Sequence, residues 1–352
     1  MRVRLTVGLM VVAALGLSIN GQQGSHLNPA IDLLMAKKAL FGLGVPSVGR
    51  AGGGGNRGRG AAAGAPTTPA PPPTPAPPAA PPKTPAELVA DAFAHPEADY
   101  FFTAMMERNI DAGATTMMAL QDAAAAAGPL SPTSPKRLRM PINSKAPNIS
   151  SAGMPADPAN YVTNLSRQLN AGVSSISFVE VDSAEELRLG IAALRFTSRG
   201  GTRPDDVGNA PKYWGLSETE YRRKSDVWPL NPEGELVVWA IVETKEGLAN
   251  VREIAQVPGL SVLAPGAGTL GGVFSTTNAE GRRVRDDVAW EAAIQTVLSA
   301  CKEFKLSCAY PVSEADIETR MQQGFNVGIL QAFNDSAFRA VAKGRALSGR
   351  DK

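Results

Sequence analysis

The fold is decided by residues 236–272, LVVWAIVETKEGLANVREIAQVPGLSVLAPGAGTLGG. The opening run LVVWAIV is apolar throughout and is followed by a single carboxylate, Glu243. Thr244 can cap a helix there, and a second apolar run at residues 260–263 leads into a glycine-rich loop. Two buried strands joined by a helix form a parallel β-α-β unit, whose chemistry concentrates where the strands end. We therefore expect Glu243 and the glycine-rich loop to lie side by side at one edge.

Size and composition allow either one large α/β barrel or two ordinary domains. The chain has 352 residues, of which 43% are hydrophobic, and a formal net charge of +2. This small charge gives no basis for a nucleic-acid-binding surface. The chain contains two cysteines and two histidines, which excludes most zinc sites and any histidine-rich chemistry.

Residues 1–21 have the pattern of a signal peptide. Two arginines precede an apolar run at residues 5–19, which contains glycines and is short for a membrane span. We expect cleavage near Gly21 and a mature protein, residues 22–352, that is periplasmic or secreted and not stably inserted in a membrane. The alternative is an uncleaved membrane anchor.

Strand and helix patterns alternate along the rest of the chain. Strands are expected at residues 39–45, 100–106, 137–140, 173–181, 236–242, 260–263, 306–310 and 325–330. The helices between them have recognisable starts, such as the capping box Thr84-Pro85-Ala86-Glu87. The long polar segment 196–235 is expected to cover the mouth of the barrel, which is the end where the carboxyl ends of the strands meet. Eight strands alternating with helices predict a single-domain (β/α)8 TIM barrel.

Cys301 and Cys308 lie on either side of a predicted helix-to-strand turn. In an exported protein they could form a disulfide, but two small buried residues would fit the pattern equally well. Spacing alone leaves both possibilities open, because it does not give the Cα separation.

The opening stretch resembles the metal-dependent class II pyruvate aldolase family, which includes 4-hydroxy-2-oxoheptanedioate aldolase and the citrate lyase beta subunit. Residues 241–244, Ile-Val-Glu-Thr, match the family's strand end Ile-Glu-Thr, and residues 257–263 match its Val-Pro-Gly-Val-Asp-Val-Leu. Residues 266–270, Gly-Ala-Gly-Thr-Leu, align with Gly-Pro-x-Asp-Leu. The resemblance covers most of residues 28–346.

The resemblance implies a fold and an activity. It implies a TIM barrel that cleaves a 4-hydroxy-2-oxo acid to a 2-oxo acid and an aldehyde, with Mg²⁺ or Mn²⁺ as cofactor, in a homo-oligomer. It also places residues 28–47 on the family's first helix and strand. The Pro/Ala/Gly-rich residues 49–83, whose composition predicts disorder, then form an insertion in the first strand-to-helix loop. A tether between the export signal and the domain is the alternative.

Candidate site residues follow from the same resemblance. Glu243 and Thr269 fall on the two metal-ligand positions, although the family has aspartate at the second. Arg139 falls on the arginine of Val-Arg-Val-Pro, where a guanidinium suits an oxo group or a carboxylate. The backbone of Gly266, Gly268 and Thr269 is expected to hold the substrate carboxylate.

Other family positions are substituted. Arg108 stands where the family has a catalytic histidine, with Met105 near the position of that histidine's aspartate, and Asn170 replaces another aspartate. We keep Arg108 and Asn170 as candidate catalytic positions, and Glu180 and Glu107 as candidates for a compensating carboxylate. A non-catalytic protein that binds a 2-oxo acid on the same barrel remains the alternative.

Two further motifs do not favour other functions. Residues 266–271 read Gly-x-Gly-x-x-Gly, but a polar loop follows them instead of the helix that a dinucleotide site needs. A Ser-His-Asp hydrolase is a poor fit because His26 lies beside the export signal and His95 in a loop before a strand.

Overall fold

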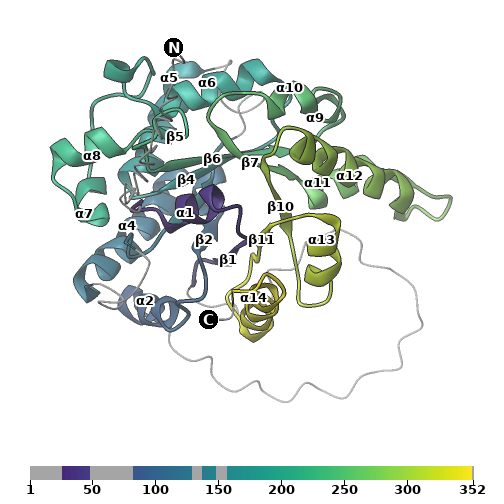
Figure 1. The fold of residues 1–352 in the computed structure, drawn as a ribbon, viewed down its shortest axis with the longest axis horizontal. Coiled ribbons are helices and arrows are strands. Elements are labelled where there is room, and N and C mark those ends of the chain that lie inside the picture. Colours follow the sequence, from purple (N-terminus) through teal and green to yellow (C-terminus); the bar gives the residue numbers. More distant parts are fainter. Residues whose placement is uncertain (1–25, 48–81, 129–136, 148–156, 351–352) are drawn as a thin grey trace, which may run out of the picture.

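The chain forms a closed barrel of eight parallel strands, with helices around it (Figure 1). This computed structural model describes residues 26–47, 82–128, 137–147 and 157–350, so the predicted signal peptide and nearly all of the 49–83 tract lie outside it. The barrel strands, in spatial order, are β1 (Leu40–Gly44), β2 (Tyr100–Thr103), β3 (Ile142–Lys145), β4 (Ser175–Phe178), β6 (Leu236–Val242), β7 (Leu260–Pro265), β10 (Ser307–Pro311) and β11 (Val327–Ile329). Pairing of β11 with β1 closes the ring. The predicted TIM barrel is confirmed.

Helices occupy the connections between these strands. They are α1 (Pro29–Met35), α2 (Pro85–Phe93), α3 (Met105–Arg108), α4 (Ile110–Ala127), α5 (Pro158–Asn170), α6 (Ala184–Leu194), α9 (Lys245–Ala249), α10 (Val251–Ala255), α11 (Ala267–Val273), α12 (Asp287–Glu303), α13 (Ile317–Gln323) and α14 (Asp335–Leu347). The capping box at Thr84 is present, with both hydrogen bonds to Glu87. Thr244 caps α9 by accepting a hydrogen bond from the Gly247 N–H.

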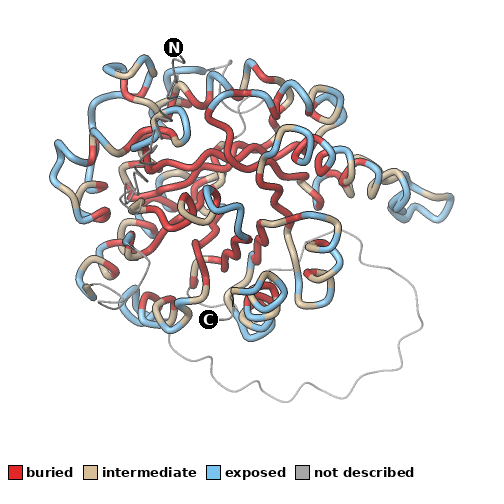
Figure 2. Tube along the Cα trace, viewed as in Figure 1, coloured by how far each residue is buried: buried red, intermediate tan, exposed pale blue. Residues whose placement is uncertain are grey.

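Alternating side chains of the strands build two hydrophobic cores. One lies between the barrel and its helices; the other fills the barrel interior and includes Tyr100 and Trp239, whose rings pack edge to face. Figure 2 shows the buried ring of strands inside helices with exposed outer faces. The register of β6 and β7 pairs Val242 with Pro265, so Glu243 and Gly266 leave the barrel at the same level.

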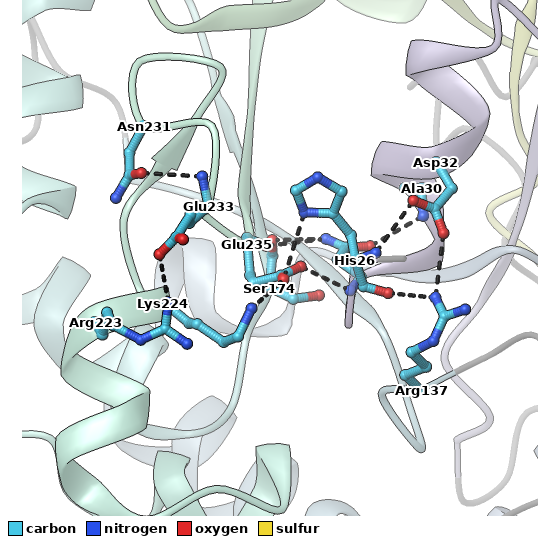
Figure 3. Close-up of polar contacts among 11 residues, drawn as sticks. His26, Ala30, Asp32, Arg137, Ser174, Arg223, Lys224, Asn231, Glu233 and Glu235 are labelled. Atoms are coloured by element: carbon cyan, nitrogen blue, oxygen red, sulfur yellow. Dashed lines mark hydrogen bonds and ion pairs between the residues drawn. The ribbon is translucent and has the colours of Figure 1, made fainter. Parts of the chain in front are cut away.

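Helix α1 covers the amino end of the barrel, where Ile31 and Leu34 join the interior core. Asn28 caps this helix, and its backbone N–H donates to the fully buried carboxylate of Glu235, which precedes β6. The same carboxylate lies 3.1 Å from Lys224 Nζ and 3.4 Å from His26 Nδ1 (Figure 3). We call Glu235 and these three partners the floor cluster.

The prediction of a strand at residues 137–140 is wrong. That stretch is irregular, and β3 begins after Pro141, whose carbonyl accepts a hydrogen bond from the Phe101 N–H. Proline is tolerated at the first position of a strand because its missing N–H is not needed there. Pro141 therefore directly precedes the strand β3 and does not follow a strand at residues 137–140.

The prediction that residues 196–235 cover the mouth is also wrong. This segment holds a 3-10 turn (Thr197–Arg199), α7 (Ala210–Trp214), α8 (Glu218–Lys224) and the short strand β5 (Val227–Trp228). It connects the end of α6 to the start of β6, and both of these lie at the amino end of the barrel. Lys224 accordingly joins the floor cluster.

Outside the barrel, the segment between α11 and α12 forms a hairpin of β8 (Ser275–Thr277) and β9 (Arg283–Arg285). Cys301 of α12 and Cys308 of β10 are joined in a disulfide, which resolves the open question about this pair. Among the described residues, no helix combines the length and the apolar character that crossing a membrane requires.

Candidate functional site

Glu243 lies at the carboxyl end of β6, where TIM barrels carry their active sites. Its side chain is almost completely buried, at 5% exposure. One carboxylate oxygen accepts a hydrogen bond from the Thr269 hydroxyl (3.0 Å), and the other accepts one from the Glu180 N–H (3.3 Å). The structure thus brings together residues that follow β4, β6 and β7. The expected proximity of Glu243 and the glycine-rich segment is confirmed, but from Ala267 onward that segment forms helix α11 and not a loop.

Gly266 provides space beside this carboxylate. A Cβ atom built on it would lie 2.2 Å from Glu243 Cγ, so any larger residue would push Glu243 away. The Gly266 N–H is already bonded to the Val242 carbonyl, so Gly266 does not supply the free N–H that we expected for a substrate carboxylate. Gly268 lies in the first turn of α11.

Glu180 follows β4 and has a positive φ of 48°, which is uncommon for a residue with a side chain. Burial raises the pKa of this carboxyl, and the negative charges of Glu243 and nearby Asp182 and Glu107 raise it further. A carboxylate with a raised pKa is a stronger general base than an ordinary one. Among the residues that the structure describes, Glu180 is therefore our candidate for the general base at the carboxyl end of the barrel.

Lys145 is a mouth residue that the sequence analysis missed. It ends β3, and its ammonium lies 3.9 Å from the carboxylate of Glu107. Gln168 holds this region by donating from its amide to the carbonyls of Lys145 and Met106. The signal was available, because Lys145-Ala146-Pro147 has the same basic-x-Pro pattern that we had assigned to Arg139-Met140-Pro141.

Arg139 does not reach the mouth. It precedes β3 and therefore lies at the amino end of the barrel, where its guanidinium donates to the Ala125 carbonyl of α4. Asn170 also lies at that end, as the last residue of α5, bonded to Asp206 and Arg203. The structure therefore places both residues away from Glu243. Arg108 ends α3, on the mouth side, but its side chain is outside the described part of the structure.

The two histidines also lie away from Glu243. His26 belongs to the floor cluster, and His95 lies after α2, stacked on Phe338 and 2.9 Å from Glu97. Among the described residues, neither histidine ring is hydrogen-bonded to a serine, threonine or cysteine side chain. Contrary to the expectation of a loop, helix α11 does begin within residues 266–271, but it ends at Val273 and is followed by the β8–β9 hairpin.

The residues at the mouth supply some of the oxygen ligands that a divalent metal needs. Glu243 and Thr269 offer one charged and one neutral oxygen that already lie together. Hard divalent cations prefer anionic oxygen, so this pair needs water and substrate oxygens to complete a coordination shell. In the part of the chain that the structure describes, no group of three or more His, Cys, Asp or Glu side chains could hold a metal.

The chain is thus a TIM barrel with carboxylates and a lysine at the carboxyl end of its strands, which is the end where barrel enzymes carry their active sites. A family model described as HpcH/HpaI aldolase/citrate lyase matches residues 155–328. The chain belongs to this family of carbon–carbon lyases. No curated protein matches the chain.

Solved structures show the same fold at low sequence identity. An HpcH/HpaI aldolase/citrate lyase family protein from Burkholderia cenocepacia is 16% identical with a TM-score of 0.58, covering 92% of this chain and 100% of its own. An HpcH/HpaI aldolase from Desulfitobacterium hafniense is 13% identical with a TM-score of 0.53, covering 91% and 93%. Macrophomate synthase is 15% identical with a TM-score of 0.52, covering 92% and 88%.

Proposed function

We propose that this protein is an exported carbon–carbon lyase that cleaves a 4-hydroxy-2-oxo acid into a 2-oxo acid, such as pyruvate, and an aldehyde. The observation that carries the proposal is the contact of Glu243 with Thr269 and with the backbone of Glu180 at the carboxyl end of the barrel. Family membership supports the reaction type, and Lys145 supplies a positive charge near Glu107 and Glu180.

The reaction can be assigned to these residues step by step. Lys145 binds the carboxylate or oxo oxygen of the substrate as a point charge. Glu180 removes the proton of the C4 hydroxyl, the C3–C4 bond breaks, and its electron pair forms the enolate while the aldehyde leaves. A proton then returns to C3 to give the 2-oxo acid. A divalent ion bound at Glu243 would polarise the oxo group.

Deuterium exchange at the methyl group of pyruvate tests this proposal, because it reports enolate formation without needing to know the aldehyde. We expect exchange that requires Mg²⁺ or Mn²⁺ and is lost in Glu243→Gln. Glu246→Gln, which changes an exposed glutamate three residues further on, should leave the exchange unchanged. Equal exchange in wild type and Glu243→Gln would refute the assignment.

A second candidate function is a non-catalytic 2-oxo-acid-binding protein. It is favoured by the Thr269 hydroxyl, which occupies one Glu243 oxygen where the family places a second carboxylate. Thr269→Asp would place that second charge beside Glu243, and we expect it to raise Mn²⁺ affinity. If the wild type binds a 2-oxo acid calorimetrically but shows no deuterium exchange, the binding protein is the better description.

Export and self-association complete the proposal. The apolar run at residues 5–19 supports a signal peptide and a periplasmic or secreted location. The Cys301–Cys308 disulfide supports it independently, because disulfides persist mainly in oxidising compartments. Sequencing the amino terminus of the mature protein should locate cleavage near Gly21. Sedimentation should show the homo-oligomer that the family resemblance implies.

A further inference from the structure

A cavity of about 210 Å³ opens at the carboxyl end of the barrel, beside the first, second and last strands. Its lining residues are Val45, Phe102, Thr103, Ala104, Met105 and Gln331. The segments that form it directly follow or complete β1, β2 and β11. Because all eight strands are parallel, this cavity lies at the same end of the barrel as Glu243.

Among the described residues, the lining carries no charged side chain. Val45, Phe102 and Met105 present apolar surface, and Phe102 belongs to the core that fills the barrel interior. The Thr103 hydroxyl oxygen accepts a hydrogen bond from the Met105 N–H. A carboxylate placed in this cavity would lose water without gaining a cationic partner from these six residues.

The cavity and the charged groups of the mouth share one wall. Helix α3 begins at Met105, which lines the cavity, and carries Glu107, whose carboxylate lies 3.9 Å from Lys145 Nζ. The buried amide of Gln168 ties this helix to the end of β3 by donating to both backbones. One end of an extended ligand can therefore contact Lys145 while the other end enters the cavity.

We propose that this cavity binds the part of the substrate that becomes the aldehyde, and that it selects an uncharged, apolar group there. This inference rests on the proposed function and narrows its substrate class to 4-hydroxy-2-oxo acids with an apolar substituent on C4. The volume is below the 300–1,000 Å³ or so of pockets for drug-sized ligands, so it suits a short alkyl chain or a single ring.

Calorimetric binding of two matched 2-oxo acids in the presence of Mg²⁺ tests the inference without requiring catalysis. 2-Oxohexanoate and 2-oxoadipate have the same chain length, but only the second ends in a carboxylate. We expect the wild type to bind 2-oxohexanoate at least ~10-fold more tightly, because burying an unpaired carboxylate is unfavourable. Equal or tighter binding of 2-oxoadipate, or no binding of either acid, would overturn the inference.

Two variants locate the selectivity in the cavity. Met105→Lys adds a cation to its wall, and we expect it to remove or reverse the preference for 2-oxohexanoate. Ala104→Lys, at an exposed position on the same wall, serves if the first variant fails to fold. Met35→Lys makes the same change on α1 at the other end of the barrel and should leave the preference unchanged.

These outcomes are separable from those of the proposed function. If pyruvate undergoes deuterium exchange but the protein binds the two acids equally well, the proposed lyase function stands and the proposed selectivity of the cavity is refuted. If the protein shows no deuterium exchange but has a preference that Met105→Lys abolishes, the proposed selectivity of the cavity stands and the lyase function is refuted. If the preference is unchanged in both Met105→Lys and Ala104→Lys, the proposal that this cavity selects the substrate is also refuted.

Discussion

At the scale of single residues, the mouth depends on how three carboxylates share a small space. Glu243 is buried, yet both of its oxygens accept hydrogen bonds, which offsets the cost of removing its charge from water. Glu180 and Glu107 add like charges nearby, and the pKa of Glu180 is raised as a result of burial and of these charges. Among the described residues, the charge of Lys145 reduces this repulsion.

The raised pKa of Glu180 makes a prediction about stability. The pKa of this carboxyl is higher in the folded state than in the unfolded state, where it is about 4.3. Folding therefore becomes less favourable as the pH rises from the unfolded-state pKa to the folded-state pKa. Glu180→Gln removes this penalty, so the variant should be at least as stable as wild type at pH 7. The difference should shrink as the pH falls below about 4.

Thermal unfolding of both proteins between pH 3 and 8 measures this effect. Glu314→Gln is the control of opposite sign, because the hydrogen bond from Arg339 lowers the pKa of Glu314. That variant should lose stability at neutral pH and approach wild type in acid. A Glu180→Gln protein that is less stable than wild type at pH 7 would show that its ionised form is stabilised instead.

Lys145 and Arg139 give a matched pair of substitutions. Lys145→Met should weaken 2-oxo acid binding, because a hydrogen bond to a charged group contributes about 1.5–3 kcal/mol, or roughly a 10- to 100-fold change in affinity. Arg139→Met removes a cation from the amino end of the barrel and should leave affinity unchanged. Calorimetric titration with pyruvate compares them, and weaker binding only in Arg139→Met would restore the original assignment.

At the scale of elements, α1 is held in place by polar contacts as well as by its apolar face. Its cap residue Asn28 donates from its side chain to the carbonyls of Ser174 and Glu235, which precede β4 and β6. Arg137 adds hydrogen bonds to Asp32 in α1 and to the His26 carbonyl (Figure 3). The helix therefore links the starts of strands that are distant in sequence.

Glu235 should be the most sensitive residue of the floor cluster. Glu235→Ala leaves Lys224 and the Asn28 N–H without their buried acceptor, and removing one partner of a buried ion pair costs about 3–5 kcal/mol. Because Lys224 is partly exposed, we expect the lower end of that range. Glu233→Ala, which breaks an exposed pair with Arg223, should cost about 0–1 kcal/mol.

Urea unfolding followed by circular dichroism would measure both free energies. Similar losses in the two variants would mean that α1 is held by its apolar face alone. In that case Ile31→Ala, which truncates a side chain in the barrel interior, should be the more damaging substitution.

At the scale of the whole molecule, the Pro/Ala/Gly tract follows one barrel element and precedes another. Strand β1 pairs with β2 and β11, and α2 begins after the tract. We predict that deleting residues 52–80 leaves the melting temperature nearly unchanged, because closure entropy grows slowly with loop length. Limited proteolysis within the tract should leave residues 26–47 bound to the rest. Free release of that fragment would favour the tether.

Much of the fold could be predicted from local sequence. The apolar run before Glu243, the caps at Thr84 and Thr244, and the alternation of strands and helices depend on neighbours within one or two turns. Such signals are complete in the sequence, so the barrel and the place of Glu243 in it were correctly predicted.

Only the tertiary structure decided which end of a strand each residue occupies. Whether Pro141 starts or ends a strand depends on the Phe101 N–H, which comes from a different strand. This one pairing moves Arg139 to the amino end of the barrel and places Lys145 at the mouth. Contacts between separate elements also decide two other features. These are the pairing of Cys301 with Cys308 and the position of residues 196–235 at the amino end of the barrel.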